Sequence, residues 1–224
     1  MRHLILVHFN AKPIVEDYIQ FTYSELTTGR FLGRGTFGVV QEVNVKLPPS
    51  REKQMKVAVK LFKGSNHPNA QLTEILKQFR NEIVISKRLE AHPNIVKFIG
   101  ACLEYPNLCL VLEYLPLGDL LSWMRDSKKK LSKDLMFRFI SDLVTGLSHI
   151  HRLGIIHRDC KSSNCLVAST DPRDSVTLKI GDFGLSRYMA KSTSPDAVLK
   201  ASLQVGTIQW TGNFQKKKKR KSSE

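Results

Sequence analysis

Apolar and polar residues alternate along much of the first half of the chain, which is typical of β-strands. Two apolar runs between Phe31 and Lys46 flank a cluster of glycines and predict a hairpin closed by a flexible loop. Residues 55–62 alternate like a third strand, and two further β-like runs cover 95–103 and 108–114. We therefore expect a sheet in this half of the protein.

Two segments show helical spacing instead. Apolar residues recur three or four positions apart between Asn69 and Leu89, and His92-Pro93-Asn94 ends that pattern. A second helix is predicted over about 133–151, with an apolar stripe formed by Leu135, Met136, Phe139, Ile140, Leu143, Val144, Leu147 and Ile150. Short strands and loops follow as far as Trp210, so a strand-rich half with one helix precedes a helical, loop-rich half.

The composition is that of an ordinary globular protein with an excess of positive charge. With 42% hydrophobic and 25% charged residues, a chain of 224 residues is not collagen-like, coiled-coil or mainly disordered. Lys and Arg outnumber Asp and Glu by 35 to 20, and six of the positive charges lie in the last nine residues. The rest of the chain is still basic, which suits anionic ligands without identifying any.

The cysteines and the apolar runs bear on the compartment. The four cysteines do not follow the spacing of a common zinc site, so we expect reduced, mostly buried thiols at Cys102, Cys109, Cys160 and Cys165. The apolar run from Leu4 to Val7 is too short for a secretory signal, and no run is long enough for a membrane span. A cytoplasmic location is expected, with a nuclear one as the alternative that the basic tail suggests.

The glycine cluster reads Gly33-x-Gly35-x-x-Gly38-x-Val40. Taken alone it has two interpretations, because glycines in a hairpin also serve simply to permit a tight turn. A dinucleotide-binding fingerprint requires a helix after the glycines, whereas here the valines continue as a strand. A glycine loop between antiparallel strands can instead fold over the phosphates of a nucleotide and offer its backbone N–H groups to them.

A lysine and a glutamate add charged groups to this half of the chain. Lys60 follows Val57-Ala58-Val59 on the third predicted strand, and Glu82 lies on the helix after it. An exposed strand lysine and a solvated helix glutamate are the ordinary interpretation of each residue by itself. Together they allow a second interpretation, in which Glu82 holds Lys60 against the α- and β-phosphates of a nucleotide.

The strongest signal is the segment His157-Arg158-Asp159-Cys160-Lys161-Ser162-Ser163-Asn164. A chance match to its five fixed positions is expected only about once in a few million starting points. In this pattern Asp159 accepts the proton of an attacking hydroxyl, Lys161 neutralises the transferred phosphoryl group and Asn164 holds a magnesium ion. Asp182-Phe183-Gly184 follows eighteen residues after Asn164 and supplies a carboxylate for the other magnesium site.

These motifs stand in the order found in the eukaryotic protein kinases, and the sequence resembles that family over about residues 25–210. The resemblance implies an α+β, two-lobed fold with ATP in the cleft. A kinase N-lobe over 25–115 would contain an antiparallel sheet, one helix, the glycine loop and the hinge. An incomplete helical C-lobe over 116–210 would contain the catalytic loop and the activation segment, with an N-terminal extension at 1–24 and a basic tail at 211–224.

The resemblance also implies a set of site residues. Asp159, Lys161, Lys60 and Glu82 would be catalytic, and Asn164 and Asp182 would bind magnesium. Leu112 would be the gatekeeper, and the hinge from Glu113 to Leu115 would read adenine through its backbone. The nucleotide would contact Gly33, Gly35, Gly38, Val40, Ala58, Lys60, Glu113, Leu115 and Leu166.

ATP and Mg²⁺ as cofactors and a protein as substrate follow from the same resemblance. Lys161 in the catalytic loop points to Ser and Thr as phosphoacceptors, and runs such as HPNIVKFIGAC and DFGLSR look like the tyrosine-kinase-like branch, close to LIM-type kinases. Ser192, Thr193 and Ser194 are candidates for an activating phosphorylation that Arg158 would pair with.

The sequence departs from the family at two places. Ser86 stands where the family has a bulky apolar residue, which predicts a gap in a stack that would include Phe98, His157 and Phe183. After Trp210 the family would continue to an Ala-Pro-Glu motif and further helices, whereas this chain reads TGNFQ and then lysines. A truncated lobe would leave the apolar stripe of the helix at 133–151 partly bare, which favours aggregation or a binding partner.

Three functions are weighed. The leading one is a protein kinase that transfers the γ-phosphoryl group of Mg-ATP to Ser and Thr hydroxyls, impaired by the missing part of the lobe. The alternative is an ATP-binding interaction module without turnover. Nucleic-acid binding through Lys216 to Lys221 is the third. We favour a different origin for this run, in which an A-rich stretch of message is read through an unspliced junction or a frame change, because lysine can be encoded by AAA. No membrane partner is expected.

Overall fold

The computed structural model describes residues 18–26, 29–35, 38–47, 54–62, 70–89, 92–126, 131–169 and 176–189. The chain divides into two compact units. The first unit comprises Met1–Ala91 and Val96–Leu115, and the second comprises His92–Ile95 and Pro116–Glu224. The candidate phosphorylation sites at 192–194 and the basic tail lie outside the described residues.

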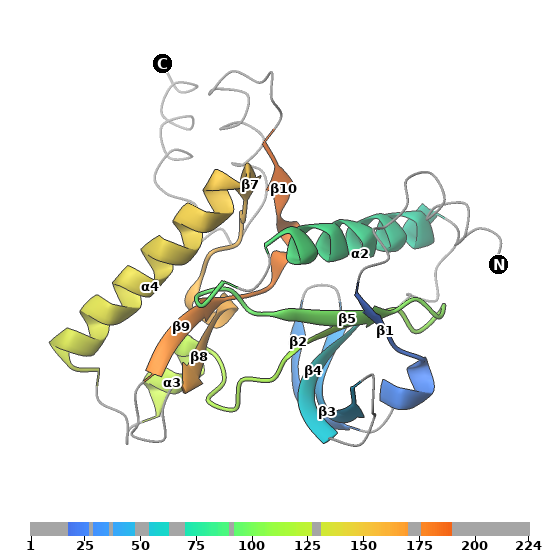
Figure 1. Cartoon of the computed structure of the whole chain (residues 1–224), viewed down its shortest axis with the longest axis horizontal. Coiled ribbons are helices and arrows are strands. Elements are labelled where there is room, and N and C mark those ends of the chain that lie inside the picture. Colours follow the sequence, from blue (N-terminus) through green and yellow to red (C-terminus); the bar gives the residue numbers. More distant parts are fainter. Residues whose placement is uncertain are drawn as a thin grey trace, which may run out of the picture. The chain divides into compact units, whose positions relative to one another are not determined.

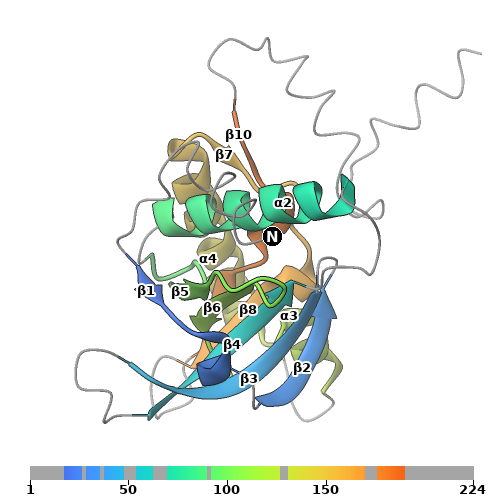
Figure 2. The same ribbon diagram turned by 90° about the vertical axis from the view of Figure 1, so that its right-hand side faces the viewer.

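The first unit is built on a six-stranded sheet in the order β1-β5-β6-β4-β3-β2 (Figures 1 and 2). Its strands are β1 (Ile19–Gln20), β2 (Gly29–Gly35), β3 (Gly38–Lys46), β4 (Gln54–Phe62), β5 (Phe98–Cys102) and β6 (Cys109–Glu113). Neighbouring strands pair antiparallel except that β1 runs parallel to β5. The predicted hairpin and the three further strands are confirmed, whereas β1 is too short to show a sequence pattern.

The alternation along β4 sends its side chains to two cores. Val57 and Val59 pack in a core on one face, next to η1 (Tyr23–Leu26), with Val43, Val45 and Val111. Phe62 belongs to the other core, where its ring meets Phe79 of α2 (Ala70–Arg88) edge to face at a centroid distance of 5.1 Å. Figures 1 and 2 show α2 lying across the sheet over β5. The predicted helix is thereby confirmed, and its apolar stripe is the buried one.

An ion-pair network spans three neighbouring strands of this sheet, β2, β3 and β4. Glu42 of β3 contacts Arg30 of β2 at 2.6 Å and Lys56 of β4 at 2.8 Å. Hydrogen bonds from Lys56 and then from Arg30 lower the pKa of the Glu42 carboxyl to about 2. The folded protein therefore binds a proton at Glu42 less readily than the unfolded chain, in which a glutamate has a pKa of about 4.3.

Glu42→Gln should make the stability of the protein less sensitive to acid. The contribution of Glu42 is fully present above the unfolded pKa and disappears as the pH falls through the folded value of about 2. The difference in urea midpoint between wild type and Glu42→Gln should thus shrink between about pH 5 and pH 2. Urea unfolding at a series of pH values measures it, and a difference that does not change with pH would contradict the pKa shift.

The second unit contains two helices and several short strands in its described residues (Figure 1). Its helices are α3 (Leu120–Arg125) and α4 (Lys133–Arg152). After α4 come β7 (Ile155–Ile156), η2 (Ser162–Asn164), β8 (Cys165–Ser169), β9 (Val176–Ile180), η3 (Phe183–Leu185) and β10 (Arg187–Tyr188). β8 pairs with β9 and β7 with β10, both antiparallel. No helix in the described part of the chain has the length and apolar character to cross a membrane.

One of the two helices differs from the sequence prediction, and the other agrees with it. The spacing analysis does not predict α3, because six residues are too few to show a helical period. Local chemistry starts this helix instead, since Oδ1 of Asp119 accepts a hydrogen bond from the Ser122 N–H at 3.0 Å. In α4 the apolar stripe is partly bare, as the sequence predicts: Phe139 and Ile150 are buried, while Met136, Ile140 and Val144 are exposed. Phe137, next to the stripe, is exposed as well.

Ile150→Ala should lower the free energy of unfolding by about 2–5 kcal/mol, because it leaves a cavity at a fully buried position. The matched substitution Ile140→Ala should cost no more than about 1 kcal/mol, since Ile140 is 49% exposed on the same helix. Urea unfolding of both variants measures the difference. Equal losses would show that the exposed half of the stripe is covered in solution.

Candidate active site

The strand register of the first unit places several predicted nucleotide-binding residues side by side. Val40 of β3 pairs with Gly33 of β2 and with Lys60 of β4. Ala58 of β4 pairs with Leu112 of β6. Because paired residues and residues two apart on a strand share a face, the side chains of Val40, Ala58, Lys60 and Leu112 lie on one face of the sheet.

Two glycines close the hairpin between β2 and β3. Gly35 and Gly38 are partners in the last described pair of this ladder. A Cβ atom on Gly38 would collide with the carbonyl oxygen of Leu61 on β4, so only glycine allows the two backbones to approach here. The close approach explains Gly38 without reference to a ligand, whereas a Cβ on Gly33 would meet no atom within 4 Å.

Lys60 and Glu82 form a buried ion pair. The Lys60 Nζ donates to Oε1 of Glu82 at 2.7 Å and to Oε2 at 3.0 Å. The two side chains are only 6% and 3% exposed. This geometry excludes the interpretation of either residue as an ordinary solvated charge. Ser86, one turn further along α2, is also buried.

The predicted hinge residues end the first unit. The Glu113 N–H donates to the Lys97 carbonyl at 3.0 Å, and Oε1 of Glu113 accepts from the Lys97 N–H at 2.7 Å. These bonds fix the backbone of Glu113, and Leu115 is the last residue before the second unit begins. In the second unit, the half-buried Leu166 lies on β8 and bridges to Asp119.

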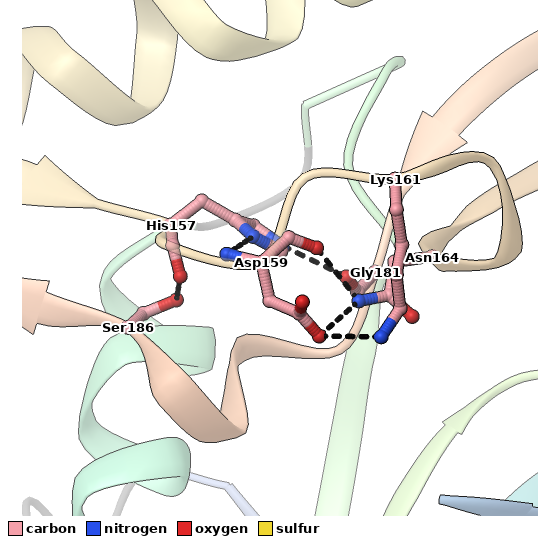
Figure 3. A network of polar contacts seen from close by, with 6 residues as sticks. All are labelled: His157, Asp159, Lys161, Asn164, Gly181 and Ser186. Atoms are coloured by element: carbon pink, nitrogen blue, oxygen red, sulfur yellow. Dashed lines mark hydrogen bonds and ion pairs between the residues drawn. The ribbon is translucent and has the colours of Figure 1, made fainter. Parts of the chain in front are cut away.

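Two side chains of the catalytic-loop motif converge on the carboxylate of Asp159 (Figure 3). Its Oδ2 accepts from Nζ of Lys161 at 2.8 Å and from Nδ2 of Asn164 at 3.0 Å. The same nitrogen of Asn164 donates to the Asp159 carbonyl at 2.8 Å. Asp159 is 5% exposed, so the carboxylate is held in one orientation in a largely buried position.

His157 ties this loop to the segment that carries Asp182. Its Nδ1 accepts from the Asp159 N–H at 3.2 Å, so Nε2 carries the proton and donates to the Gly181 carbonyl at 2.9 Å. Burial lowers the pKa of His157, which agrees with the neutral ring that these bonds require. The hydroxyl of Ser186 donates to the His157 carbonyl at 3.2 Å (Figure 3).

The backbone is strained at one residue of the catalytic loop and at one residue of the segment that carries Asp182. Arg158 and Asp182 adopt left-handed conformations, with φ values of 66° and 60°. Residues other than glycine rarely do so, and such strain gathers at functional sites. The Gly181 N–H donates to the Asn164 carbonyl at 2.9 Å, and Nε of Arg158 donates to the Leu185 carbonyl at 2.7 Å. Through the first of these hydrogen bonds, the residue before Asp182 lies directly beside Asn164.

The donor atoms at this place suit a magnesium ion. Mg²⁺ prefers oxygen ligands and keeps waters and phosphate oxygens in its shell. Asn164 bonds to Asp159 through its amide nitrogen, which leaves its amide oxygen for a metal, and Asp182 adds a carboxylate. The described residues contain no cluster of three His, Cys, Asp or Glu for a metal ion, so magnesium here would depend on phosphate and water for its other ligands.

Some contributors to the site have no signature in the sequence. His157 is part of the motif, but the motif does not show that its ring bonds to two backbone groups, the Asp159 N–H and the Gly181 carbonyl. Ser186 is fully buried and bonds a carbonyl 29 residues away. Any residue type offers a backbone carbonyl, so no spacing or composition signal could have revealed these contacts.

Comparisons with known proteins agree on the family. A model of the family described as protein tyrosine and serine/threonine kinase matches residues 26–219. A probable serine/threonine-protein kinase of Dictyostelium discoideum is 38% identical over 175 residues, which are 78% of this chain and 17% of that protein. Tyrosine-protein kinase Fer of Rattus norvegicus is 34% identical over 199 residues, with 82% of this chain and 22% of Fer covered.

The name of a plant relative includes both serine/threonine and tyrosine as phosphoacceptors. The serine/threonine/tyrosine-protein kinase HT1 of Arabidopsis thaliana is 33% identical over 159 residues, which are 70% of this chain and 38% of HT1. The chain thus spans less than two fifths of the length of each of these three relatives. Because the family model extends over most of the sequence, this chain belongs to the protein tyrosine and serine/threonine kinase family.

Proposed function

We propose that this chain transfers the γ-phosphoryl group of Mg-ATP to serine and threonine hydroxyls of proteins. The observation that carries the proposal is the convergence of Lys161 and Asn164 on the buried carboxylate of Asp159. A carboxylate fixed in this way can orient an attacking hydroxyl and accept its proton. The ammonium of Lys161, 2.8 Å from that carboxylate, offsets negative charge on the phosphoryl group during transfer.

The first unit supplies the nucleotide-binding groups in this proposal. Lys60, held by Glu82, binds the α- and β-phosphates, and the backbone N–H groups around Gly33, Gly35 and Gly38 cover the phosphates. Val40 and Ala58 offer apolar surface to the adenine ring, and their place on the same face as Lys60 supports this role. Leu166 of the second unit adds apolar surface, and the backbone from Glu113 to Leu115 bonds the adenine edge.

Asn164 and Asp182 hold magnesium in the same proposal, and their oxygen donors support it. Bound magnesium neutralises charge on the phosphates of the nucleotide. The residues of the chain orient the reacting groups: His157 keeps Asp159 in register with the Asp182 segment through its two hydrogen bonds. Catalysis of this kind depends mainly on position and charge, so these links matter as much as the charged side chains.

Serine and threonine specificity rests on Lys161 and on the named relatives. The Dictyostelium relative is named for serine/threonine activity, Fer for tyrosine and HT1 for both. This mixture, together with the runs HPNIVKFIGAC and DFGLSR, supports a place in the tyrosine-kinase-like branch. A protein substrate and a cytoplasmic location complete the proposal.

A transfer assay tests it. The purified chain is incubated with γ-³²P-ATP, magnesium and a mixture of casein and histone, and the labelled proteins are hydrolysed to their phosphoamino acids. Phosphoserine and phosphothreonine that disappear when EDTA removes magnesium are the expected result. Labelled phosphotyrosine alone would contradict the specificity, and no label at all would contradict the activity.

One observation favours a second candidate function, an ATP-binding module that acts through contacts with other proteins. The exposed apolar side chains of α4, Phe137 at 65% above all, form a surface suited to a partner. The two functions differ in a simple pair of measurements. A rise in melting temperature with Mg-ATP in the absence of any phosphoryl transfer would favour the module.

A further inference from the structure

Two histidines of the second unit lie face to face. His92 begins the short segment His92–Ile95, and His149 lies in the last turn of α4. Their rings are stacked, with centroids 4.5 Å apart and planes 22° from parallel. Both side chains are half-buried, and the proposed function uses neither of them.

The hydrogen bonds of the two rings require both rings to be neutral. Nδ1 of His92 accepts from the Asn94 N–H at 3.1 Å, and Nδ1 of His149 accepts from a guanidinium N–H of Arg152 at 3.3 Å. A backbone N–H and a guanidinium can only donate, so neither Nδ1 carries a proton. A second proton on either ring would have to bind at Nδ1, and it would break one of these bonds.

The charges around the pair also disfavour a second proton. Burial lowers the pKa of His92, and positive charge on His149 and Arg152 lowers it further. The segment His92–Ile95 contains no other titratable side chain. Asp142 of α4 directs its Oδ2 to β9, where it accepts two hydrogen bonds at 2.9 and 2.8 Å. Lys179 of β9 lies on the strand face opposite to the one that packs on α4.

The segment that begins with His92 is anchored to β9 through Asn94. Nδ2 of Asn94 donates to the Leu178 carbonyl at 3.0 Å and to the Thr177 hydroxyl at 3.3 Å. The Asn94 carbonyl accepts from the Ile180 N–H at 2.8 Å, and Asn94 is a buried residue. The backbone N–H of the same Asn94 bonds the His92 ring, so a change at this ring acts on the residue that holds β9.

We propose that the stacked pair of His92 and His149 is a pH switch. When both rings are neutral, they hold the segment His92–Ile95 against α4 and β9. When Nδ1 of His92 takes up a proton from the solvent, it no longer accepts from the Asn94 N–H, and the positive ring faces His149 and Arg152. The rings then separate and the bonds between Asn94 and β9 weaken. Loss of the proton at higher pH restores the stack.

The switch should make the protein less stable in mild acid. The folded pKa of His92 lies below its ordinary value of 6.5, so the unfolded chain binds the proton more readily. The contribution of the pair is therefore fully present above about pH 6.5 and is lost as the pH falls below that value.

A consequence for activity rests on the proposed function. β9 ends at Ile180, and the next residue, Gly181, accepts a hydrogen bond from His157 and precedes Asp182. A shift of catalytic groups by about 1 Å can cost 10²-fold in rate. Between about pH 7.5 and pH 5.5, wild-type transfer should therefore fall about 10-fold more than transfer by a variant in which residue 92 does not titrate.

NMR of the unchanged full chain tests the switch directly. The ring Cε1–H signal of His92 is followed from about pH 8 to pH 5, and its pKa should lie below the ordinary value. Over the same range, the protection of the Ile180 N–H from hydrogen exchange, relative to its intrinsic rate, should fall by about 10-fold or more. The Val167 N–H, which bonds the Gly118 carbonyl at 2.8 Å in the same unit, should keep its protection.

His92→Asn is the matched variant. An asparagine side-chain oxygen can accept the same bond from the Asn94 N–H, but it takes up no proton near neutral pH. This variant should keep the protection of Ile180 in acid. His151→Asn, at an exposed position two residues from His149, is the control and should behave like the wild type.

The outcomes separate the switch from the proposed function. An ordinary or raised pKa of His92 in the wild type, or an equal loss of Ile180 protection in the wild type and in His92→Asn, would overturn the switch. The wild-type titration decides this even if His92→Asn does not fold. If no variant transfers phosphoryl groups at any pH, the proposed function is wrong, while titration and exchange still decide the switch. If the switch opens without slowing transfer, only its effect on activity is wrong.

Discussion

Asp159→Asn should lower the rate of phosphoryl transfer by about 10²–10⁴-fold and leave the binding of Mg-ATP intact. Asparagine has nearly the shape of aspartate, and its oxygen can still accept hydrogen bonds from Lys161 and Asn164 at the position of Oδ2. An amide oxygen does not take up a proton near neutral pH, so the hydroxyl loses its base. The variant therefore removes the ability of residue 159 to accept a proton while it keeps the hydrogen bonds that hold the loop.

Initial rates with γ-³²P-ATP measure this effect, and the Mg-ATP-dependent rise in melting temperature reports binding. Asp134→Asn, on the exposed first turn of α4, removes the same charge far from the motif along the chain and serves as the control. Urea unfolding should show similar stability for both variants. A variant at position 159 that keeps more than half of the wild-type rate would refute the assignment of Asp159 as the base.

Lys60→Met should destabilise the protein by about 3–5 kcal/mol and remove the stabilisation by Mg-ATP. The substitution leaves the Glu82 carboxylate 3% exposed and without the ammonium that contacts both of its oxygens. A buried charge that loses its partner is expensive because neither water nor the protein replaces the lost interaction. The loss of nucleotide response follows separately from the proposed contact of Lys60 with the phosphates.

The double variant Lys60→Met/Glu82→Met separates these two effects. With both charges replaced by apolar side chains, most of the stability should return, while the response to Mg-ATP and the phosphoryl transfer should stay absent. Urea unfolding of the wild type, the two single variants and the double variant gives the coupling energy between the residues. Additive losses would show that the pair is not coupled, and a normal Mg-ATP response in Lys60→Met would remove Lys60 from the nucleotide site.

Much of the fold follows from patterns that are local in the chain. Alternation over 55–62 corresponds to β4, and the helical spacings correspond to α2 and α4, because side-chain direction depends on the backbone period alone. The catalytic-loop motif indicated the family for a similar reason, since its residue types and spacing are legible without any contact. Short elements such as α3 and β1 escape this approach because a period cannot show in so few residues.

The environment of individual residues could not be predicted in the same way. Ile140 and Ile150 belong to one apolar stripe, yet one is half exposed and the other is buried. The ordinary interpretation of Lys60 as a surface lysine was open in the sequence, and the 2.7 Å contact with Glu82 removes it. The sequence predicted mostly buried thiols, and Cys102, Cys109 and Cys165 are buried whereas Cys160 is exposed.

The sequence by itself determined the succession of the longer strands and helices, the kinase family and the identity of the charged residues in its motifs. Only the tertiary structure decided that Glu82 pairs with Lys60, that His157 is a neutral link between Asp159 and Gly181, and that Cys160 is the accessible sulfur. The physical reason is that periodicity and spacing are properties of neighbouring residues. Burial, protonation and hydrogen bonding depend on segments that come together only when the chain packs.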